Sequence, residues 1–466
     1  NITVPLVGMV DIAVAGHLDT NAATMIGGIA IGSMLFDLLY WNFGFLRVGT
    51  GGLTAQAFGK QDWKECARIL TRALGISLGI AICLILIQWI FVKAAFLVVD
   101  CTPEVRELAS RYFFIRIWAA PATLSLMALK GWFIGMQDSV SAMITDFVVN
   151  GMNVLMSIVL ALGITVPSAG VLINGMGFSG IAAGTVTAQY SGLITALLLV
   201  AVRYRRRVFE AFSSADLKGV FKGSETRRFF VMNADLFVRS LCFIAIYIGF
   251  TVISARYGDI LLAVSSIMMK ILMIFSYFTD GFAYAGEAMT GRYIGARDLP
   301  NLRTTVKWTF VWSMGLAVAF VGIYHFGGVL LLKMMTSDVA VVEASRDYLP
   351  WLVLMPVVGC AAFTWDGIFI GATGSKDMRN SMLWSVVAFA GVWIAGVVVL
   401  NCFHPLSSGI PFASPDLSTV PSDAMPAPTP YGIAAMHILM GAYFAHLLAR
   451  TIYLTIRSPR IYQLPA

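Results

Sequence analysis

Long apolar segments separated by short polar links run along the whole chain. A membrane-spanning helix needs about 20 mostly apolar residues, and most of these segments reach that length. The pattern predicts twelve helices, at residues 1–18, 24–58, 67–99, 105–135, 139–164, 174–203, 229–256, 260–291, 302–333, 338–371, 379–403 and 430–456. The first segment is short and begins at Asn1, so we expect the protein to start upstream and this helix to be clipped. The chain is therefore predicted to be an all-α polytopic membrane protein.

The two halves of the chain resemble each other at an offset of roughly 236 residues. The stretch at 131–135, GWFIG, matches GIFIG at 367–371, and the stretch at 42–62 matches 279–298 through shared glycines and a shared final Gly…Asp. Two similar membrane halves are typical of secondary transporters. We predict two pseudo-symmetric six-helix lobes.

The predicted organisation has three parts. Residues 1–207 form the N-lobe, residues 208–228 a basic cytoplasmic linker, and residues 229–466 the C-lobe. Lys and Arg concentrate in alternate links, around residues 60–68, 203–228, 292–307, 376–379 and 457–460. By the positive-inside rule these links and both termini are cytoplasmic, and the Pro-rich stretch at 404–430 is a long outside loop. The expected location is the plasma (inner) membrane.

Composition agrees with this class. Of 466 residues, 58% are hydrophobic and 12% are charged, about half the charge of a soluble domain. The net charge of +7 follows from the basic links, so it does not indicate a nucleic-acid partner. The sequence has no phosphate-binding loop, no H-E-x-x-H and no G-x-S-x-G. We therefore expect no direct use of ATP, no enzyme activity and no cofactor other than a coupling ion.

Two acids fall at membrane depth in the first two segments. Asp11 lies roughly 12 Å from the outer end of the first segment, and Asp37 lies roughly 18 Å from the same surface. Burial and mutual repulsion would favour the protonated form of a carboxylate, as a reversible proton carrier requires. A Na⁺ site would use the same carboxylate with oxygens from Asn42, Asn150 or Asn153. For both acids the alternative is a hydrogen-bonded structural group.

Other ionisable residues also lie within spans. Arg47, Lys130 and Asp146 are expected near the cytoplasmic ends of their helices, where charge compensation between helices is the plainer interpretation. In the second half, Asp235 and Arg239 are spaced i, i+4 and are predicted to pair. The remaining members of this second-lobe polar cluster are Asp280, Glu287 and Asp366. Because Asp366 takes the place of Lys130 in the repeat, the two lobes are not equivalent in charge.

Several stretches resemble the multidrug and toxic compound extrusion (MATE) family, in its DinF-type branch. They include Asn1-Ile-Thr-Val-Pro-Leu with Asp11 and Gly16-His-Leu18, and then Phe43-Gly-Phe-Leu-Arg47 followed by Leu53-Thr-Ala-Gln-Ala57. Later stretches are Lys130-Gly-Trp-Phe-Ile-Gly135, Asp235-Leu-Phe…Arg239 and Trp365-Asp-Gly-Ile-Phe-Ile-Gly-Ala-Thr373. The resemblance covers essentially the whole chain.

This resemblance implies two six-helix lobes around a V-shaped central cavity and the export of amphipathic, often cationic organic compounds against an inward H⁺ or Na⁺ gradient. Asp11 is similar to the family's ion-coupling carboxylate, and Asn153 to an asparagine of the same network. Some members carry an aspartate four residues later, where this chain has Ser157. Asp366 resembles an acid of a C-lobe cation site in sodium-coupled members, and Asp235 is the nearest match to that branch's helix 7 acid.

The leading interpretation is a monomeric secondary antiporter for small organic molecules, coupled to H⁺ or Na⁺, with Na⁺ sites conceivable at Asp11 or Asp366. The alternative within the same superfamily is a flippase for a lipid-linked precursor. Such proteins tend to have a strongly cationic cavity, and this chain offers few central bases beyond Arg47 and Lys130. A third class, a membrane scaffold or enzyme, is disfavoured by the paired halves and the intramembrane acids.

Overall fold

The computed structural model describes residues 11, 13–15, 22–97, 99, 101–166, 170–205, 220–221, 223–336, 338–403 and 429–463, and nearly all of them are helical. Asp11 and residues 13–15 are helical; the rest of the first predicted segment lies outside the described residues. Ten described helices are long and apolar enough to cross a membrane, or eleven when the bent pair at 24–37 and 42–59 counts as one span.

The described chain forms two compact units, Asn1–Asn233 (the N-terminal unit) and Ala234–Ala466 (the C-terminal unit). The N-terminal unit contains α2 (Ala22–Trp41), α3 (Phe45–Gly59), α4 (Trp63–Ala95), α5 (Pro103–Arg116), α6 (Ala120–Gly135), α7 (Ser139–Leu162) and α8 (Phe178–Tyr204), with the single turns η1 (Asn42–Gly44) and η2 (Ile117–Ala119). The strands β1 (Gly163–Val166) and β2 (Gly170–Asn174) follow α7.

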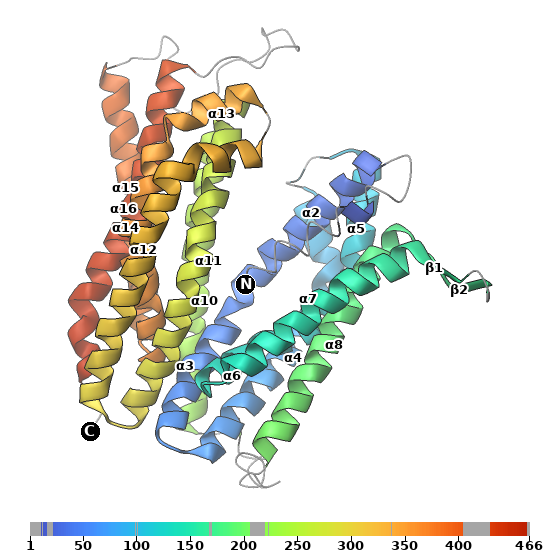
Figure 1. The fold of residues 1–466 in the computed structure, drawn as a ribbon, viewed down its shortest axis with the longest axis vertical. Coiled ribbons are helices and arrows are strands. Elements are labelled where there is room, and N and C mark those ends of the chain that lie inside the picture. The colour runs from blue at the N-terminus through green and yellow to red at the C-terminus, as the bar shows by residue number, and fades with distance from the viewer. Residues whose placement is uncertain are drawn as a thin grey trace. The chain divides into compact units, whose positions relative to one another are not determined.

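Helix α10 (Ser224–Ala255) begins in the N-terminal unit and continues into the C-terminal unit. The C-terminal unit continues with α11 (Asp259–Gly295), α12 (Leu299–Met335), α13 (Val339–Arg346), α14 (Leu349–Gly371), α15 (Ser375–Phe403), α16 (Pro430–Arg457) and the turn η5 (Ser458–Tyr462). Figure 1 shows α7 beside α8 in one unit and α15 beside α16 in the other.

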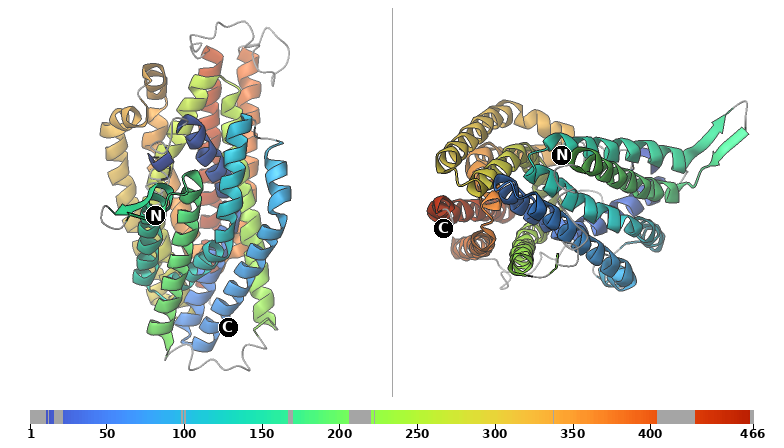
Figure 2. Two further views of the ribbon diagram at one scale, coloured as in Figure 1. Left: turned by 90° about the vertical axis from the view of Figure 1, so that its right-hand side faces the viewer. Right: turned by 90° about the horizontal axis from the view of Figure 1, so that it is seen from below.

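Three features of the chain differ from the predicted segments. The span predicted at 338–371 divides into α13 and α14, because Pro350 starts a new helix in its first turn. The link predicted at 166–174 forms an antiparallel hairpin of β1 and β2, which extends from the ends of α7 and α8 (Figure 2). The division between the two units falls at Ala234, inside α10, whereas the sequence predicts the second lobe to begin at 229.

One three-residue turn recurs at four places. It joins α3 to α4, α6 to α7, α11 to α12 and α14 to α15, and equivalent turns in the two units are 236 residues apart. In each turn the middle residue has a positive φ although it is not glycine: Gln61, Gln137, Arg297 and Thr373. Such a conformation costs roughly 1 kcal/mol, so it is held by the helices on either side. The halves therefore repeat in backbone geometry as well as in sequence.

Three of these turns end in an aspartate that caps the next helix. Asp62, Asp138 and Asp298 accept hydrogen bonds from the backbone N–H three residues on, at 3.0, 2.9 and 3.1 Å. Asp138 also binds Arg203 and Tyr204 at the end of α8. Burial opposes ionisation of Asp138, but hydrogen bonds from Ser141, Tyr204 and Arg203 outweigh it and lower its pKa. The stability from this cap is therefore lost as pH falls through the lowered pKa.

Glycines allow the central helices of each unit to touch through their backbones. A Cβ on Gly131 of α6 would lie 2.1 Å from the carbonyl oxygen of Arg47 in α3. At the equivalent place in α14, a Cβ on Gly367 would lie 2.0 Å from the carbonyl oxygen of Ala283 in α11. This close approach explains why the two halves share the spacing of small residues in GWFIG and GIFIG.

We expect Gly367→Ala to destabilise the protein by about 1–3 kcal/mol or more, because the added methyl group forces α14 away from α11. The matched control is Gly315→Ala in α12, where a Cβ meets nothing within 4 Å. This change should be neutral or stabilising by up to about 1 kcal/mol. The thermal unfolding midpoint of each variant in detergent measures the difference. Equal midpoints would contradict the proposed backbone contact.

Candidate functional site

Asp11 is buried in the N-terminal unit and has a neutral partner. It is 5% exposed, and Ser157 Oγ of α7 donates a hydrogen bond of 3.0 Å to its Oδ1. Within the part of the chain that the structure describes, no base forms an ion pair with this carboxylate. Ser157, the residue at which the chain departs from some family members, thus donates to the acid of the first segment. Among the described residues, Asp11 therefore has a hydroxyl donor and no ion-paired base.

Asn153 lies one turn before Ser157 on the same face of α7. Its Nδ2 donates to Thr185 Oγ1 of α8 at 3.0 Å, and its Oδ1 has no hydrogen-bond partner among the described residues. Helices α7 and α8 approach closely here, since a Cβ on Gly184 would lie 2.5 Å from the backbone nitrogen of Ser157. Asp11, Ser157, Asn153 and Thr185 thus form a buried polar strip in this unit.

The other predicted residues of this unit lie in different surroundings. Asp37 is exposed on α2, Arg47 is half-buried on α3, and Asn150 is half-buried on α7. Lys130 of α6 and Asp146 of α7 form an ion pair with side chains 29% and 33% exposed. This pair joins two neighbouring helices and leaves no net charge.

Arg116 was not singled out from the sequence, although it stands in the middle of the span at 103–135. It ends α5, and its Nη1 donates to Tyr112 Oη at 3.0 Å and to Ser33 Oγ of α2 at 3.4 Å. Its guanidinium group also lies over the rings of Phe36 and Tyr112, 4.8 and 5.5 Å from the ring centres. A base within an apolar segment is the sequence feature that could have identified Arg116. The same criterion identified the acids.

In the C-terminal unit, Asp366 of α14 lies between two arginines. Its Oδ2 forms ion pairs with Arg239 of α10 and with Arg450 of α16, and its Oδ1 accepts from Arg450 Nε at 3.0 Å. Arg450 is 2% exposed, so the pair is deeply buried. Asp280 of α11 is half-buried, and Glu287 of α11 is fully buried. Both oxygens of Asp366 therefore already hold guanidinium groups, an arrangement unsuited to a Na⁺ ion.

The predicted pairing of Asp235 with Arg239 is wrong. Asp235 binds Arg379 of α15 at 2.6 Å and accepts from Ser375 Oγ at 2.9 Å, while Arg239 binds Asp366. The i, i+4 spacing places two side chains on one helix face, but each of these finds a closer partner on another helix. Arg379 lies in a predicted link and Arg450 in the last predicted span, and neither was among the candidate residues.

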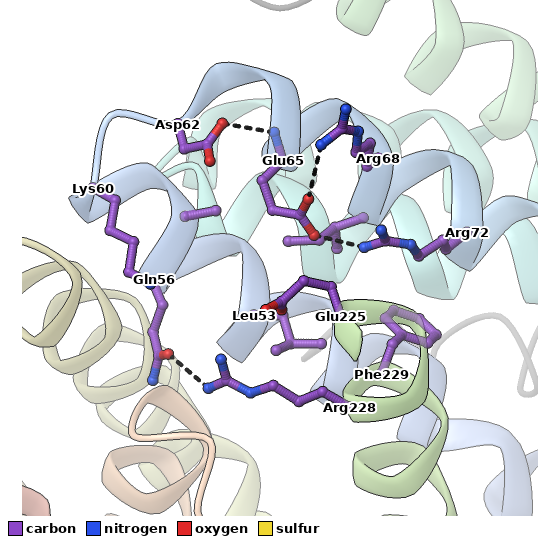
Figure 3. A pocket seen from close by; sticks show the side chains of 12 residues that line it. Leu53, Gln56, Lys60, Asp62, Glu65, Arg68, Arg72, Glu225, Arg228 and Phe229 are labelled. Carbon is purple, nitrogen blue, oxygen red and sulfur yellow. Dashed lines mark hydrogen bonds and ion pairs between the residues drawn. The ribbon is translucent and has the colours of Figure 1, made fainter. Parts of the chain in front are cut away.

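A polar pocket of about 260 Å³ lies in the N-terminal unit, between the end of α3, the start of α4 and the start of α10. Figure 3 shows Glu65 between Arg68 and Arg72, and Arg228 pointing to Gln56. Arg72 Nη1 binds Glu65 at 2.5 Å, and its Nε donates to the carbonyl oxygen of Val220 at 2.7 Å. Four bases and three acids line the pocket, so it favours neither sign of ion. These contacts join α4 to Val220, which precedes α10, and the start of α10 to α3.

Comparisons with known proteins give the family. A family model described as MatE matches residues 1–159 and 236–399. The chain belongs to the MATE family. The DNA damage-inducible protein F of Escherichia coli (strain K12) is 35% identical over 390 residues, which cover 84% of this chain and 82% of the relative. The resemblance to the DinF-type branch is thereby confirmed.

This chain is also similar to more distant members of the MATE family. The probable multidrug resistance protein NorM of Photorhabdus laumondii is 24% identical over 397 residues, covering 83% of this chain and 81% of that protein. A crystal structure of MATE in the bent conformation superposes with a TM-score of 0.76 at 14% identity, covering 99% of this chain and 93% of that one. This chain therefore has the MATE fold and is a multi-pass membrane protein.

Proposed function

We propose that this chain is a secondary active antiporter that exports amphipathic, often cationic organic compounds in exchange for inward H⁺. The observation that carries the proposal is the state of Asp11, a buried carboxylate with a hydroxyl donor and no ion-paired base among the described residues. The similarity to a protein named for multidrug resistance supports the substrate class. The family assignment does not favour the alternative of a lipid-linked precursor flippase.

In the proposed mechanism, Asp11 binds either a proton or the charge of the substrate. The ionised carboxylate attracts an organic cation, and Ser157 stabilises that form by donating a hydrogen bond. A proton from the outside removes the charge, weakens the attraction and releases the substrate. The gradient can drive export only because the two access states differ in their affinity for the proton. The proposal also includes a monomeric protein whose twelve helices form two lobes.

We infer H⁺ rather than Na⁺ from the partners of the acids. Na⁺ requires several oxygen ligands, and the oxygens of Asp366 are taken by Arg239 and Arg450. At Asp11, the described contact is a single hydroxyl. Exchange of a proton needs no such set of ligands, so it is the simpler use of this carboxylate.

The proposed orientation puts both termini in the cytoplasm and the protein in the inner membrane. In the C-terminal unit the chain end lies beside the basic turns: Arg460 binds Asp377 at 3.4 Å, and Arg303 lies 5.8 Å from the ring centre of Tyr462. The C-terminus and the links that start α12 and α15 are therefore at one end of the unit. The positive-inside rule assigns that end to the cytoplasm.

The test uses the purified protein in vesicles with ΔpH and ΔNa⁺ imposed separately. We expect ΔpH alone to drive the flux of a fluorescent organic cation, and a Na⁺ gradient alone to have no effect. Flux that needs ΔNa⁺ would overturn proton coupling. Absence of flux with either gradient, together with transfer of a lipid-linked sugar, would overturn the antiporter itself.

A further inference from the structure

The polar pocket of the N-terminal unit lies at the depth of lipid headgroups. Two apolar helices that are long enough to span a membrane begin beside it, α4 at Trp63 and α10 at Ser224. The ring of Trp63 packs against the ring of Phe58, with 5.7 Å between the ring centres. Tryptophan at the boundary of an apolar span is typical of the membrane–water interface, where the headgroups are found.

Buried side chains from three helices form the inner wall of the pocket. They are Leu53 and Ala57 of α3, Ile69 and Arg72 of α4, and Phe229 of α10. Arg72 is 4% exposed, and its bonds to Glu65 and to the carbonyl oxygen of Val220 fix it in place. The volume of about 260 Å³ is below the range of pockets that hold drug-sized ligands. The pocket therefore suits a small polar group.

Several of the polar groups around the pocket already have partners within the protein. Asp62 accepts a hydrogen bond of 3.0 Å from the backbone N–H of Glu65, and Arg72 binds the Glu65 carboxylate at 2.5 Å. Arg228 donates to the side-chain oxygen of Gln56 at 3.2 Å. These contacts hold the walls together, so a ligand is better served by other charges.

Lys60 and Glu225 supply such charges. Both are exposed and line the pocket, Lys60 directly after α3 and Glu225 in the first turn of α10 (Figure 3). Within the part of the chain that the structure describes, neither side chain forms a hydrogen bond or an ion pair, and the two do not pair with each other. The pocket thus offers a ligand one positive and one negative group.

We propose that this pocket binds the headgroup of phosphatidylethanolamine. The phosphate accepts hydrogen bonds from the ammonium of Lys60, and the ammonium of the ethanolamine donates to the carboxylate of Glu225. Glu225 repels an inorganic anion and Lys60 repels a metal cation, so a ligand that carries both signs fits the pair best. A choline headgroup has no N–H to donate, and a glycerol headgroup has no positive charge. Lipids with those headgroups should therefore bind less tightly.

The test offers three lipids with identical acyl chains to the purified full chain in detergent: phosphatidylethanolamine, phosphatidylcholine and phosphatidylglycerol. Native mass spectrometry measures the lipid retained, and the thermal unfolding midpoint measures the stabilisation. We expect phosphatidylethanolamine to be retained at least about fivefold more than either other lipid, which is the effect of one exposed charge-assisted contact. Equal retention of the three lipids would overturn the proposal.

Two variants remove one contact each. Glu225→Gln should abolish the preference for phosphatidylethanolamine over phosphatidylglycerol, because the ammonium loses its acceptor. Lys60→Gln should lower the retention of phosphatidylethanolamine about fivefold. The matched controls are Glu104→Gln, an exposed glutamate in the first turn of α5, and Lys64→Gln, an exposed lysine of α4 outside the pocket lining. The proposal fails if either pocket variant behaves like its control.

A charge reversal and a soluble headgroup complete the experiment. Glu225→Lys should reverse the preference, so that phosphatidylglycerol is retained over phosphatidylethanolamine, and an unchanged preference would contradict the assigned contact. Soluble glycerophosphoethanolamine has the same headgroup without acyl chains. We expect it to raise the unfolding midpoint less than the lipid does. Equal stabilisation would overturn the lipid assignment and would identify a site for a soluble phosphoamine.

Discussion

We expect Asp11→Asn to reduce the ΔpH-driven efflux of organic cations to the background of protein-free vesicles. The asparagine side chain can still accept the hydrogen bond from Ser157, so the buried strip keeps its geometry. It cannot bind or release a proton, so the site no longer distinguishes a high from a low proton concentration. Efflux in vesicles and the pH dependence of substrate binding measure the change, and binding should become independent of pH.

The matched control is Asp259→Asn, which changes an exposed aspartate at the start of α11. This variant should transport like the wild type. Ser157→Ala removes the donor and retains the carboxylate, so it should shift the pH profile of efflux while leaving coupled transport in place. Normal coupled efflux by Asp11→Asn would show that this acid is a structural group and that the exchange is carried elsewhere.

We expect Asp366→Asn to destabilise the protein by about 3–5 kcal/mol, because it leaves the buried guanidinium group of Arg450 and the half-buried one of Arg239 without their shared counter-charge. Three helices, α10, α14 and α16, meet at this carboxylate, so the loss affects the packing of the whole C-terminal unit. The thermal unfolding midpoint in detergent and the yield of folded protein from membranes measure the effect. The double variant Asp366→Asn, Arg450→Met should recover part of the loss.

The control for this cluster is Asp377→Asn. Its arginine partners, Arg457 and Arg460, are 37% and 57% exposed and lie 3.8 and 3.4 Å away, so their loss should cost no more than about 1 kcal/mol. The opposite result at Asp366, wild-type stability with lost efflux, would identify it as an ion-coupling acid in the sense first suggested by the resemblance.

The sequence was informative where one residue type was unusual for its surroundings. An aspartate in an apolar segment predicted that Asp11 lies at membrane depth, and this side chain is buried. The shared spacing of GWFIG and GIFIG predicted a repeat, and the structure places Gly131 and Gly367 at equivalent helix contacts. Both inferences depend on local composition. The family assignment through the motifs of the first two segments followed in the same way and is confirmed by the comparisons.

The sequence was less informative where the outcome depended on helices far apart in the chain. The partner of Asp235 is 144 residues away, and Arg450 is 84 residues from Asp366. No spacing rule predicts such pairs, because they depend on which helix faces which within a unit. The short helix α13 was not predicted as a separate helix for another reason. When only hydropathy is considered, it is apolar enough to merge with α14.

The repeated three-residue turns make the two ends of each unit unequal in their tolerance of insertions. At one end, α3–α4, α6–α7, α11–α12 and α14–α15 are joined by connections of a single length with one fixed backbone geometry. Any added residue there would rotate the following helix out of register with its neighbour. The other end of the N-terminal unit carries the β1–β2 hairpin, which connects α7 to α8. Epitope tags and fusion partners therefore belong in this hairpin and not in the four turns.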